Sequence, residues 1–167
     1  MSEIQVTWET LIQNLKSRLN RLGDYNLTLV ALPLESAHLD APRLCKELGG
    51  SYYDFDRELV LRLEDDGWED HLNLSKRGSL QPGRSLADEL LDDILAELSP
   101  TRPIVIGNSN LAVYYEMDLG ALLYPRTRGG HCILAAPGRV RGQVLLLQGL
   151  HQQTGSGFTS TWELVNG

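Results

Sequence analysis

Two carboxylates separated by one residue, Asp54 and Asp56, stand at the end of a predicted strand. Carboxylate oxygens hold divalent cations such as Mg²⁺, so this pair could support metal-dependent chemistry on phosphate esters. Aspartate is also a preferred helix N-cap residue, and a helix is predicted to begin at the same point. The strand–helix junction favours the capping interpretation over a metal site.

A nucleotide site would be expected in the turn that follows the first buried strand, within residues 31–40. In P-loop proteins, glycines in this turn wrap the phosphates and a lysine offsets their charge. Here the turn contains neither glycine nor lysine, and Glu35 stands where the phosphates would lie. Two like charges 4 Å apart repel by about 4 kcal/mol at an effective dielectric of 20. The sequence therefore predicts no bound nucleotide and no cofactor.

A second element of phosphate-transfer sites is also missing after the predicted strand at 104–106. A Walker B strand ends in an acid that positions Mg²⁺, whereas Gly107 and Asn108 follow this strand. A carboxamide brings no anionic charge to a divalent cation. We therefore assign no catalytic residue and no metal ligand from these motifs.

Four arginines flank the predicted strand at 132–136, namely Arg126, Arg128, Arg139 and Arg141. They belong to residues 101–167, which carry a net charge of +2, whereas residues 1–100 carry −9. Arginine is enriched at protein interfaces, so a protein partner with an acidic patch is their best functional use. They are candidate partner-binding residues.

The segment 158–165 adds two aromatic candidates for partner binding, Phe158 and Trp162. This segment is predicted to be the last strand, and an apolar strand at the edge of a sheet tends to be covered by another chain. The pattern therefore also predicts self-association into a homo-oligomer through this edge.

The remaining chemistry-bearing residues show no site spacing. The acidic run at 65–70 lacks the pattern of a calcium loop, and Ser109 between two asparagines indicates turn chemistry rather than a nucleophile. Cys45 and Cys132 are predicted to be small core residues. The histidines have no metal-ligand spacing with one another or with the cysteines: His38, His71, His131 and His151.

The elements that position these residues alternate between helices and strands, which is typical of an α/β three-layer sandwich with a mostly parallel central sheet. Thr7 is expected to cap the first helix, and Gly23 to follow its end. A long loop is predicted at 64–84, and Ser85 with Asp88 resembles a capping box. The chain is interpreted as one domain, 1–167. Helices are predicted at 7–22, 40–48, 56–63, 85–98 and 111–123, and strands at 27–33, 51–55, 104–106, 132–136, 143–147 and 158–165, the last two as an antiparallel pair.

Composition limits the classes of function. The 167 residues have a formal net charge of −7, which argues against non-specific binding to nucleic acid or acidic membranes. No apolar run approaches the length of about 20 residues that a membrane helix needs. Two cysteines and an N-terminus without signal-peptide features predict a cytoplasmic protein.

The order of parts resembles a known family. The strand at 27–32, the helix Arg43-Leu-Cys-Lys-Glu-Leu-Gly-Gly and the segment Ser51-Tyr-Tyr-Asp-Phe-Asp-Arg-Glu-Leu are similar to the front half of small P-loop-like proteins of BREX phage-defence systems. Pro137-Gly138, followed by Gly142-Gln143-x-Leu145, resembles a late turn in the PglZ-associated BrxB-like members, of which BrxF is a sister type. The resemblance spans residues 25–165. It implies antiviral defence, a degenerate nucleotide site and a PglZ-like protein partner.

Two functional hypotheses follow. The first is a non-catalytic adaptor that keeps the α/β scaffold and binds another component of a defence complex. The second is a metal-dependent enzyme acting on nucleic acid or nucleotides, with Asp54 and Asp56 as metal ligands and the C-terminal arginines holding phosphate. The second hypothesis requires the acids and the arginines to meet at one edge of the sheet.

Overall fold

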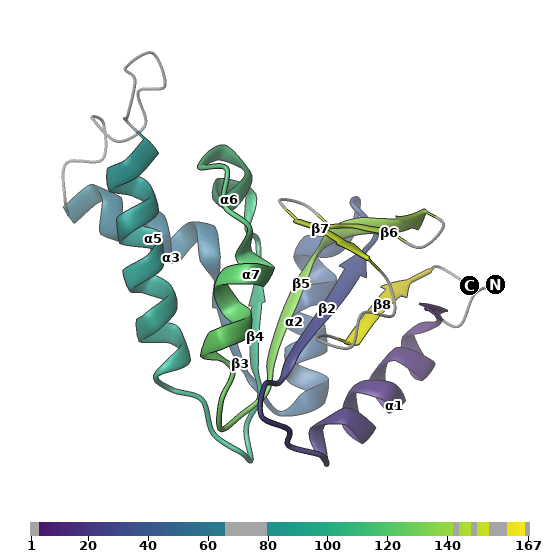
Figure 1. The fold of residues 1–167 in the computed structure, drawn as a ribbon. Coiled ribbons are helices and arrows are strands. Elements are labelled where there is room, and N and C mark those ends of the chain that lie inside the picture. Colours follow the sequence, from purple (N-terminus) through teal and green to yellow (C-terminus); the bar gives the residue numbers. More distant parts are fainter. Residues whose placement is uncertain (1–3, 66–79, 142–143, 148–149, 154–159, 166–167) are drawn as a thin grey trace.

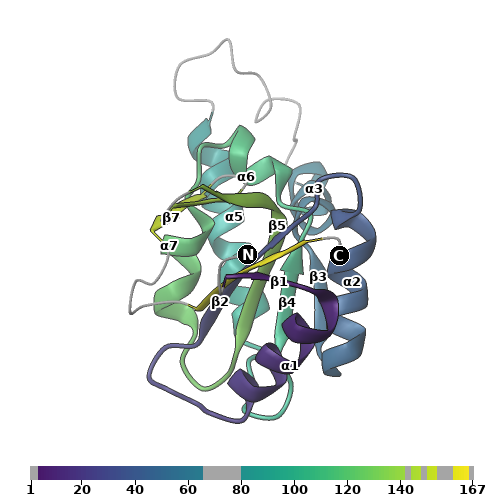
Figure 2. The ribbon, with the colours of Figure 1, turned by 90° about the vertical axis from the view of Figure 1, so that its right-hand side faces the viewer.

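The computed structural model of the chain describes residues 4–65, 80–141, 144–147, 150–153 and 160–165, and it has the predicted α/β fold. A mostly parallel sheet lies between two layers of helices (Figure 1). The helices α1 (Trp8–Leu19) and α2 (Ala37–Leu48) cover one face. The opposite face is covered by α3 (Phe55–Asp65), α5 (Leu80–Leu95), α6 (Asn110–Tyr114) and α7 (Leu119–Leu123). In Figure 2, α7 of this layer and α2 of the first layer lie to the left and to the right of the strands.

The sheet path runs β1-β8-β2-β5-β4-β3, and all these neighbours are parallel. The central strand β2 is buried at all six residues because helices cover both of its faces. Beyond the parallel sheet, β5 continues and pairs with β6 in antiparallel fashion. The strands are β1 (Gln5–Val6), β2 (Leu27–Leu32), β3 (Ser51–Asp54), β4 (Ile104–Gly107), β5 (Cys132–Arg141), β6 (Val144–Leu147), β7 (Leu150–Gln153) and β8 (Ser160–Leu164).

The predicted pairing of the last two strands is wrong. The antiparallel partners of β6 are β5 and β7, whereas β8 lies between β1 and β2 and is parallel to both. The reason is burial: Trp162 and Leu164 pack in the same core cluster as α1 and α2, so β8 belongs inside the main sheet. It follows that 160–164 is not an exposed edge, and the predicted self-association through this edge loses its basis.

The first helical layer is shifted from its predicted bounds. The Thr7 side chain accepts a hydrogen bond from the Thr10 amide, as predicted for the N-cap, but α1 ends at Leu19 and Gly23 is not its terminating residue. Gly23 instead bonds through its amide and its carbonyl to the Asn26 side chain. Helix α2 begins before Asp40, so Pro42 lies inside it, and Gly49 ends it with a φ of 66°.

The second helical layer differs from the prediction in the segment 64–84, which was expected to be a long loop. Residues 80–84 form the start of α5, so Ser85 and Asp88 lie within this helix and are not a capping box. Gly83 lets α5 approach the buried Tyr115 ring closely, and this close packing explains why a glycine lies near the start of the helix. The other loop residues, 66–79, lie outside the described part, as do Asp66, Glu69, Asp70 and His71. Within the described residues, no helix combines the length and the apolar character that a membrane span requires.

Both cysteines are free and buried, as predicted, but His131 is an unexpected core residue with only 3% of its surface exposed. Neither ring nitrogen has a hydrogen-bond partner of normal geometry in the described part of the chain. Burial lowers the pKa of His131, the nearby Arg18 charge lowers it further, and the Arg21 backbone offsets part of this effect. The folded state therefore favours the neutral imidazole.

We expect the free energy of unfolding to fall as the pH is lowered from 7.5 to 5.5. The pKa of folded His131 lies below the unfolded value of 6.5, so its contribution is present above pH 6.5 and is lost as the pH falls. Urea denaturation at several pH values should show a flatter profile for His131→Leu. The control is His38→Gln, which replaces an exposed histidine of α2. An unchanged profile in His131→Leu would contradict the assignment.

Candidate functional site

The carboxyl edge of the sheet holds the residues that the sequence singled out. The chain leaves β2 toward β3 on one side of the sheet and leaves β5 toward β8 on the other, so the two connections run in opposite directions past the ends of the neighbours β2 and β5. Ligands of open α/β sheets bind outside the carboxyl ends of the strands. A cavity of about 150 Å³ lies here, lined among others by Leu34, His38 and Asn108. This edge is the first candidate site.

Asp54 is a structural residue at this edge. One carboxylate oxygen accepts hydrogen bonds from the Arg57 amide, at 3.0 Å, and from the Asn108 side chain, at 2.8 Å. The first bond caps α3, which confirms the capping interpretation. The second joins the end of β3 to the end of β4. Asn108 adopts a φ of 54°, a conformation that asparagine tolerates better than most residues.

Asp56 stabilises the start of α6. One oxygen accepts from the Leu111 amide at 2.8 Å, and the other accepts from the amide and the side chain of Asn110, both at 3.1 Å. Burial raises the pKa of Asp56, while the hydrogen bonds from Leu111 and Asn110 offset part of the rise. The carboxylate would have to release these donors to bind a metal ion.

Tyr52 lies beside these acids on β3. Its hydroxyl oxygen would be 2.7 Å from a Cβ at Gly107, so the two strands require a glycine here. Burial, followed by the charge of Asp54, raises the pKa of Tyr52 to about 12. The phenol therefore stays protonated at neutral pH and does not act as a general base.

The turn after β2 presents acidic and apolar groups where a phosphate cradle would be expected. The Ser36 hydroxyl donates to the Asp40 carboxylate at 2.7 Å, and Glu35 is exposed. The Leu34 side chain is 75% exposed. Arg43 on α2 is stacked over the Trp8 ring, with 4.1 Å between the guanidinium carbon and the ring centroid. The turn therefore favours a protein contact over a phosphate group.

The structure does not bring the four candidate partner-binding arginines together. Arg126 lies at the amino edge, where it donates to Asp88 and Asp92 on α5, each at 2.7 Å. Arg128 donates to the Tyr25 hydroxyl at the same edge. Arg139 and Arg141 are exposed on the extension of β5 beyond the carboxyl edge. The two pairs therefore belong to opposite edges of the sheet.

The structure describes only one of the two aromatic candidates. Phe158 lies outside the described residues, and Trp162 is partly buried against the cluster of α1 and α2. Ser109 is fully buried at the start of α6, and its hydroxyl has no hydrogen-bond partner in the described residues. Neither Trp162 nor Ser109 offers an exposed chemical group at the carboxyl edge.

Glu163 is a buried acid that the sequence analysis missed. Its carboxylate accepts from the Val140 amide at 3.0 Å and from the Gln5 side chain at 3.1 Å. It thereby fixes the extension of β5, which carries Arg139 and Arg141, to the main sheet. The alternation in the last strand, with Glu163 between two apolar residues, is the only sequence signal for this role.

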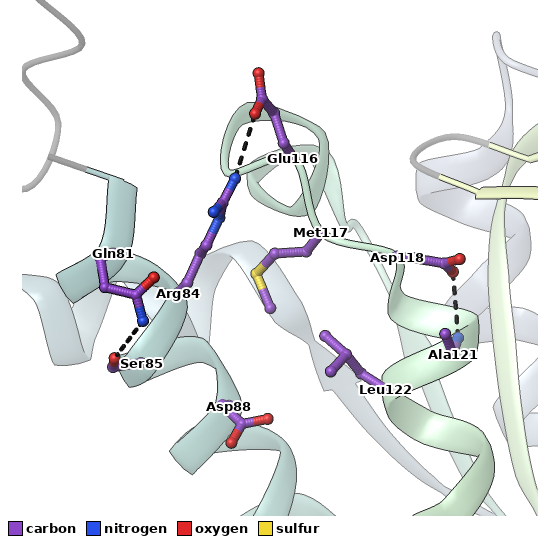
Figure 3. A pocket seen from close by; sticks show the side chains of 9 residues that line it. All are labelled: Gln81, Arg84, Ser85, Asp88, Glu116, Met117, Asp118, Ala121 and Leu122. Carbon is purple, nitrogen blue, oxygen red and sulfur yellow. Dashed lines mark hydrogen bonds and ion pairs between the residues drawn. The ribbon is translucent and has the colours of Figure 1, made fainter. Parts of the chain in front are cut away.

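A larger groove, of about 470 Å³, lies between α5 and the segment 116–122 (Figure 3). Arg84 reaches across its upper end and donates to the Tyr115 carbonyl, at 2.7 Å, and to the Glu116 carboxylate, at 3.2 Å. Met117 and Leu122 extend from the second wall toward α5. The walls are about 30 residues apart in the chain, so sequence periodicity gave no signal for this groove.

Comparison of the chain with protein-family models, with curated proteins and with solved structures finds no match. Within the described residues, no group of three His, Cys, Asp or Glu side chains is placed to hold a metal ion. The carboxyl edge and the groove are therefore the two surfaces from which a function can be inferred.

Proposed function

We propose that the chain is a non-catalytic adaptor of a bacterial antiphage defence complex and binds a partner protein of the PglZ type. The family resemblance supplies the class of complex and of partner. The adaptor role is supported by one observation at the carboxyl edge: one oxygen of Asp54 and both oxygens of Asp56 already accept hydrogen bonds from the chain itself. An enzyme site would need these groups to be available for substrate or metal.

The partner is proposed to contact an edge surface formed by Leu34, Leu39, Arg139 and Arg141. The two leucines are 75% and 65% exposed, the highest values among the exposed large hydrophobic side chains of the described residues. Leu34 and Pro137 line the same cavity, and Arg139 follows Pro137 on the same face of β5. An apolar centre with adjacent arginines suits a partner surface that has apolar groups and an acidic rim.

Leu34→Ser and Arg139→Glu should each weaken binding of a co-expressed PglZ-type protein by at least about tenfold, because interface energy concentrates in a few anchors. Affinity is measured by biolayer interferometry on the purified proteins. The controls are Leu22→Ser, an exposed leucine at the opposite edge, and Lys16→Glu, an exposed charge on α1. Both controls should bind normally.

Calorimetry of the isolated chain should give no heat of binding for ATP or GTP with Mg²⁺. Micromolar affinity for either nucleotide would contradict the adaptor role, as would the lack of a complex with the PglZ-type protein. A complex that both edge variants leave intact would contradict the edge surface.

A metal-dependent enzyme is a second candidate, and one observation favours it. Asp54 and Asp56 follow β3, and Arg139 and Arg141 extend β5, so acids and arginines share the carboxyl edge with β4 between them. This hypothesis expects Mg²⁺-dependent cleavage of DNA, RNA or nucleotides that Asp54→Asn with Asp56→Asn abolishes. No cleavage of any of these substrates by the wild-type chain would exclude it.

A further inference from the structure

The groove between α5 and the segment 116–122 is distinct from the carboxyl-edge surface and has its own chemistry. Its α5 wall is formed by Gln81, Arg84, Ser85 and Asp88, and its opposite wall by residues 116–118, 121 and 122. Figure 3 shows the two walls facing each other, with Arg84 and Glu116 closing one end. The volume of about 470 Å³ is large enough for a long side chain from another molecule.

The groove carries an excess of negative charge. Asp88, Glu116 and Asp118 line it, whereas Arg84 is the only cation among its lining residues in the described structure. Arg84 is already paired with Glu116. Outside the groove, Arg126 is shared between Asp88 and Asp92, so one cation serves two carboxylates. A positively charged occupant would therefore meet a net charge of its opposite sign.

Between these charges the groove is apolar. Met117 is 7% exposed, and Leu122 is half-buried. Both side chains point from their wall toward α5 (Figure 3). Methionine adapts its shape to irregular partners, and the aliphatic stems of basic residues bury readily along such surfaces. The groove thus combines apolar side chains on one wall with the carboxylates of Asp88 and Glu116, the pattern that matches a long basic side chain.

We propose that this groove binds an arginine side chain presented by a partner protein. The guanidinium group is more weakly hydrated than an ammonium group and presents several donors to a carboxylate, so it loses less on entering a partly apolar groove. The Asp88 side chain remains 49% exposed although it contacts Arg126, and it can accept further hydrogen bonds. This inference rests on the proposed adaptor function and gives the adaptor a second contact, of opposite charge preference to the edge surface.

The test is a titration of the isotope-labelled full chain with N-acetyl-arginine methylamide, followed by amide chemical shifts. We expect saturable shifts at Met117, Asp118 and Ala121 with a dissociation constant on the order of 1 mM at low salt, several-fold weaker in 0.5 M NaCl. The corresponding lysine compound should bind more weakly. The norleucine compound, which lacks the charge, should cause no shift in the groove.

The variant Ser85→Lys places a cation on the exposed α5 rim of the groove and should abolish these shifts. Lysine is a good helix former, so α5 should be retained. Gln13→Lys adds the same charge at an exposed position of α1 and should leave binding unchanged. Absence of groove shifts with the arginine compound, or equal binding of the norleucine compound, would overturn the proposal.

Failure of this proposal is distinguishable from failure of the adaptor function. If the arginine compound does not bind but the PglZ-type complex forms, only the groove assignment is wrong. If the compound binds in the groove but no such complex forms, the adaptor assignment is wrong, and the groove keeps its preference for a basic group.

Discussion

Replacing Gly83 with alanine should destabilise the protein by about 2 kcal/mol, although the same change in an ordinary helix interior is stabilising by up to about 1 kcal/mol. The reason is the Tyr115 ring, which packs directly against Gly83. A Cβ at this position would overlap the ring carbons and lie 2.6 Å from the hydroxyl oxygen. Tyr115 is fully buried, so it cannot move aside without disturbing the core under α5.

Urea denaturation of Gly83→Ala measures the effect, and Gly23→Ala is the matched control. A Cβ at Gly23 would meet its nearest atom at 3.6 Å, an ordinary contact, so this control should stay close to wild type. In a Tyr115→Leu background the ring is absent, and Gly83→Ala should become neutral or stabilising. Equal destabilisation in both backgrounds would show that the ring is not the cause.

The parts of the fold that could be predicted are those in which local pattern and tertiary burial agree. The strands at 27–32, 104–107 and 132–136 are apolar apart from Thr28, because parallel strands covered by helices on both faces have no polar side. The cap at Asp54 was predictable for a similar reason: the aspartate and the amide that it accepts from are three residues apart. Such signals need no knowledge of the rest of the chain.

The parts that could not be predicted depend on contacts between distant segments. Pro82 and Gly83 are typical of a loop, yet both lie near the start of α5, where Gly83 leaves room for the Tyr115 ring. The sequence predicts that the strand at 158–165 pairs with the strand at 143–147, whereas the apolar residues of β8 place it beside β2. The groove likewise depends on how α5 packs against residues more than 20 positions away. Local periodicity contains no information on these arrangements.

The hydrogen-bond partners of Asp56 bear on the choice between adaptor and enzyme. Its neighbour Asp54 caps its own helix, but Asp56 caps a helix that begins 54 residues later, through the pairing of β3 with β4. A sequence pattern shows only the spacing of the two acids, which suits a metal pair and a helix junction equally well. Their hydrogen-bond partners distinguish the two interpretations.

Asp56→Ala should therefore lower the free energy of unfolding by about 3 kcal/mol, because hydrogen bonds to a charged acceptor contribute about 1.5–3 kcal/mol each and the substitution leaves the Asn110 and Leu111 amides without it. Asp56→Asn should be less harmful but still destabilising, since an amide nitrogen would then face a donor at Asn110. The control is Asp65→Ala, at the exposed end of α3, the helix to which Asp56 also belongs, and it should change stability by less than about 0.5 kcal/mol.

Thermal unfolding of the wild type in Mg²⁺ and in EDTA distinguishes a structural Asp56 from an Asp56 that binds a metal ion. A structural Asp56 gives a wild-type melting temperature that is the same in both solutions, because its oxygens are occupied by backbone and side-chain donors. A metal ligand gives a wild-type melting temperature that rises with Mg²⁺ through binding to the folded state, and Asp54→Asn with Asp56→Asn removes that rise. A rise of the wild-type melting temperature with Mg²⁺ would contradict the structural role and favour the enzyme hypothesis. A loss of stability in Asp56→Ala, together with a wild-type melting temperature that does not respond to Mg²⁺, supports a scaffold whose acids hold two strand ends together.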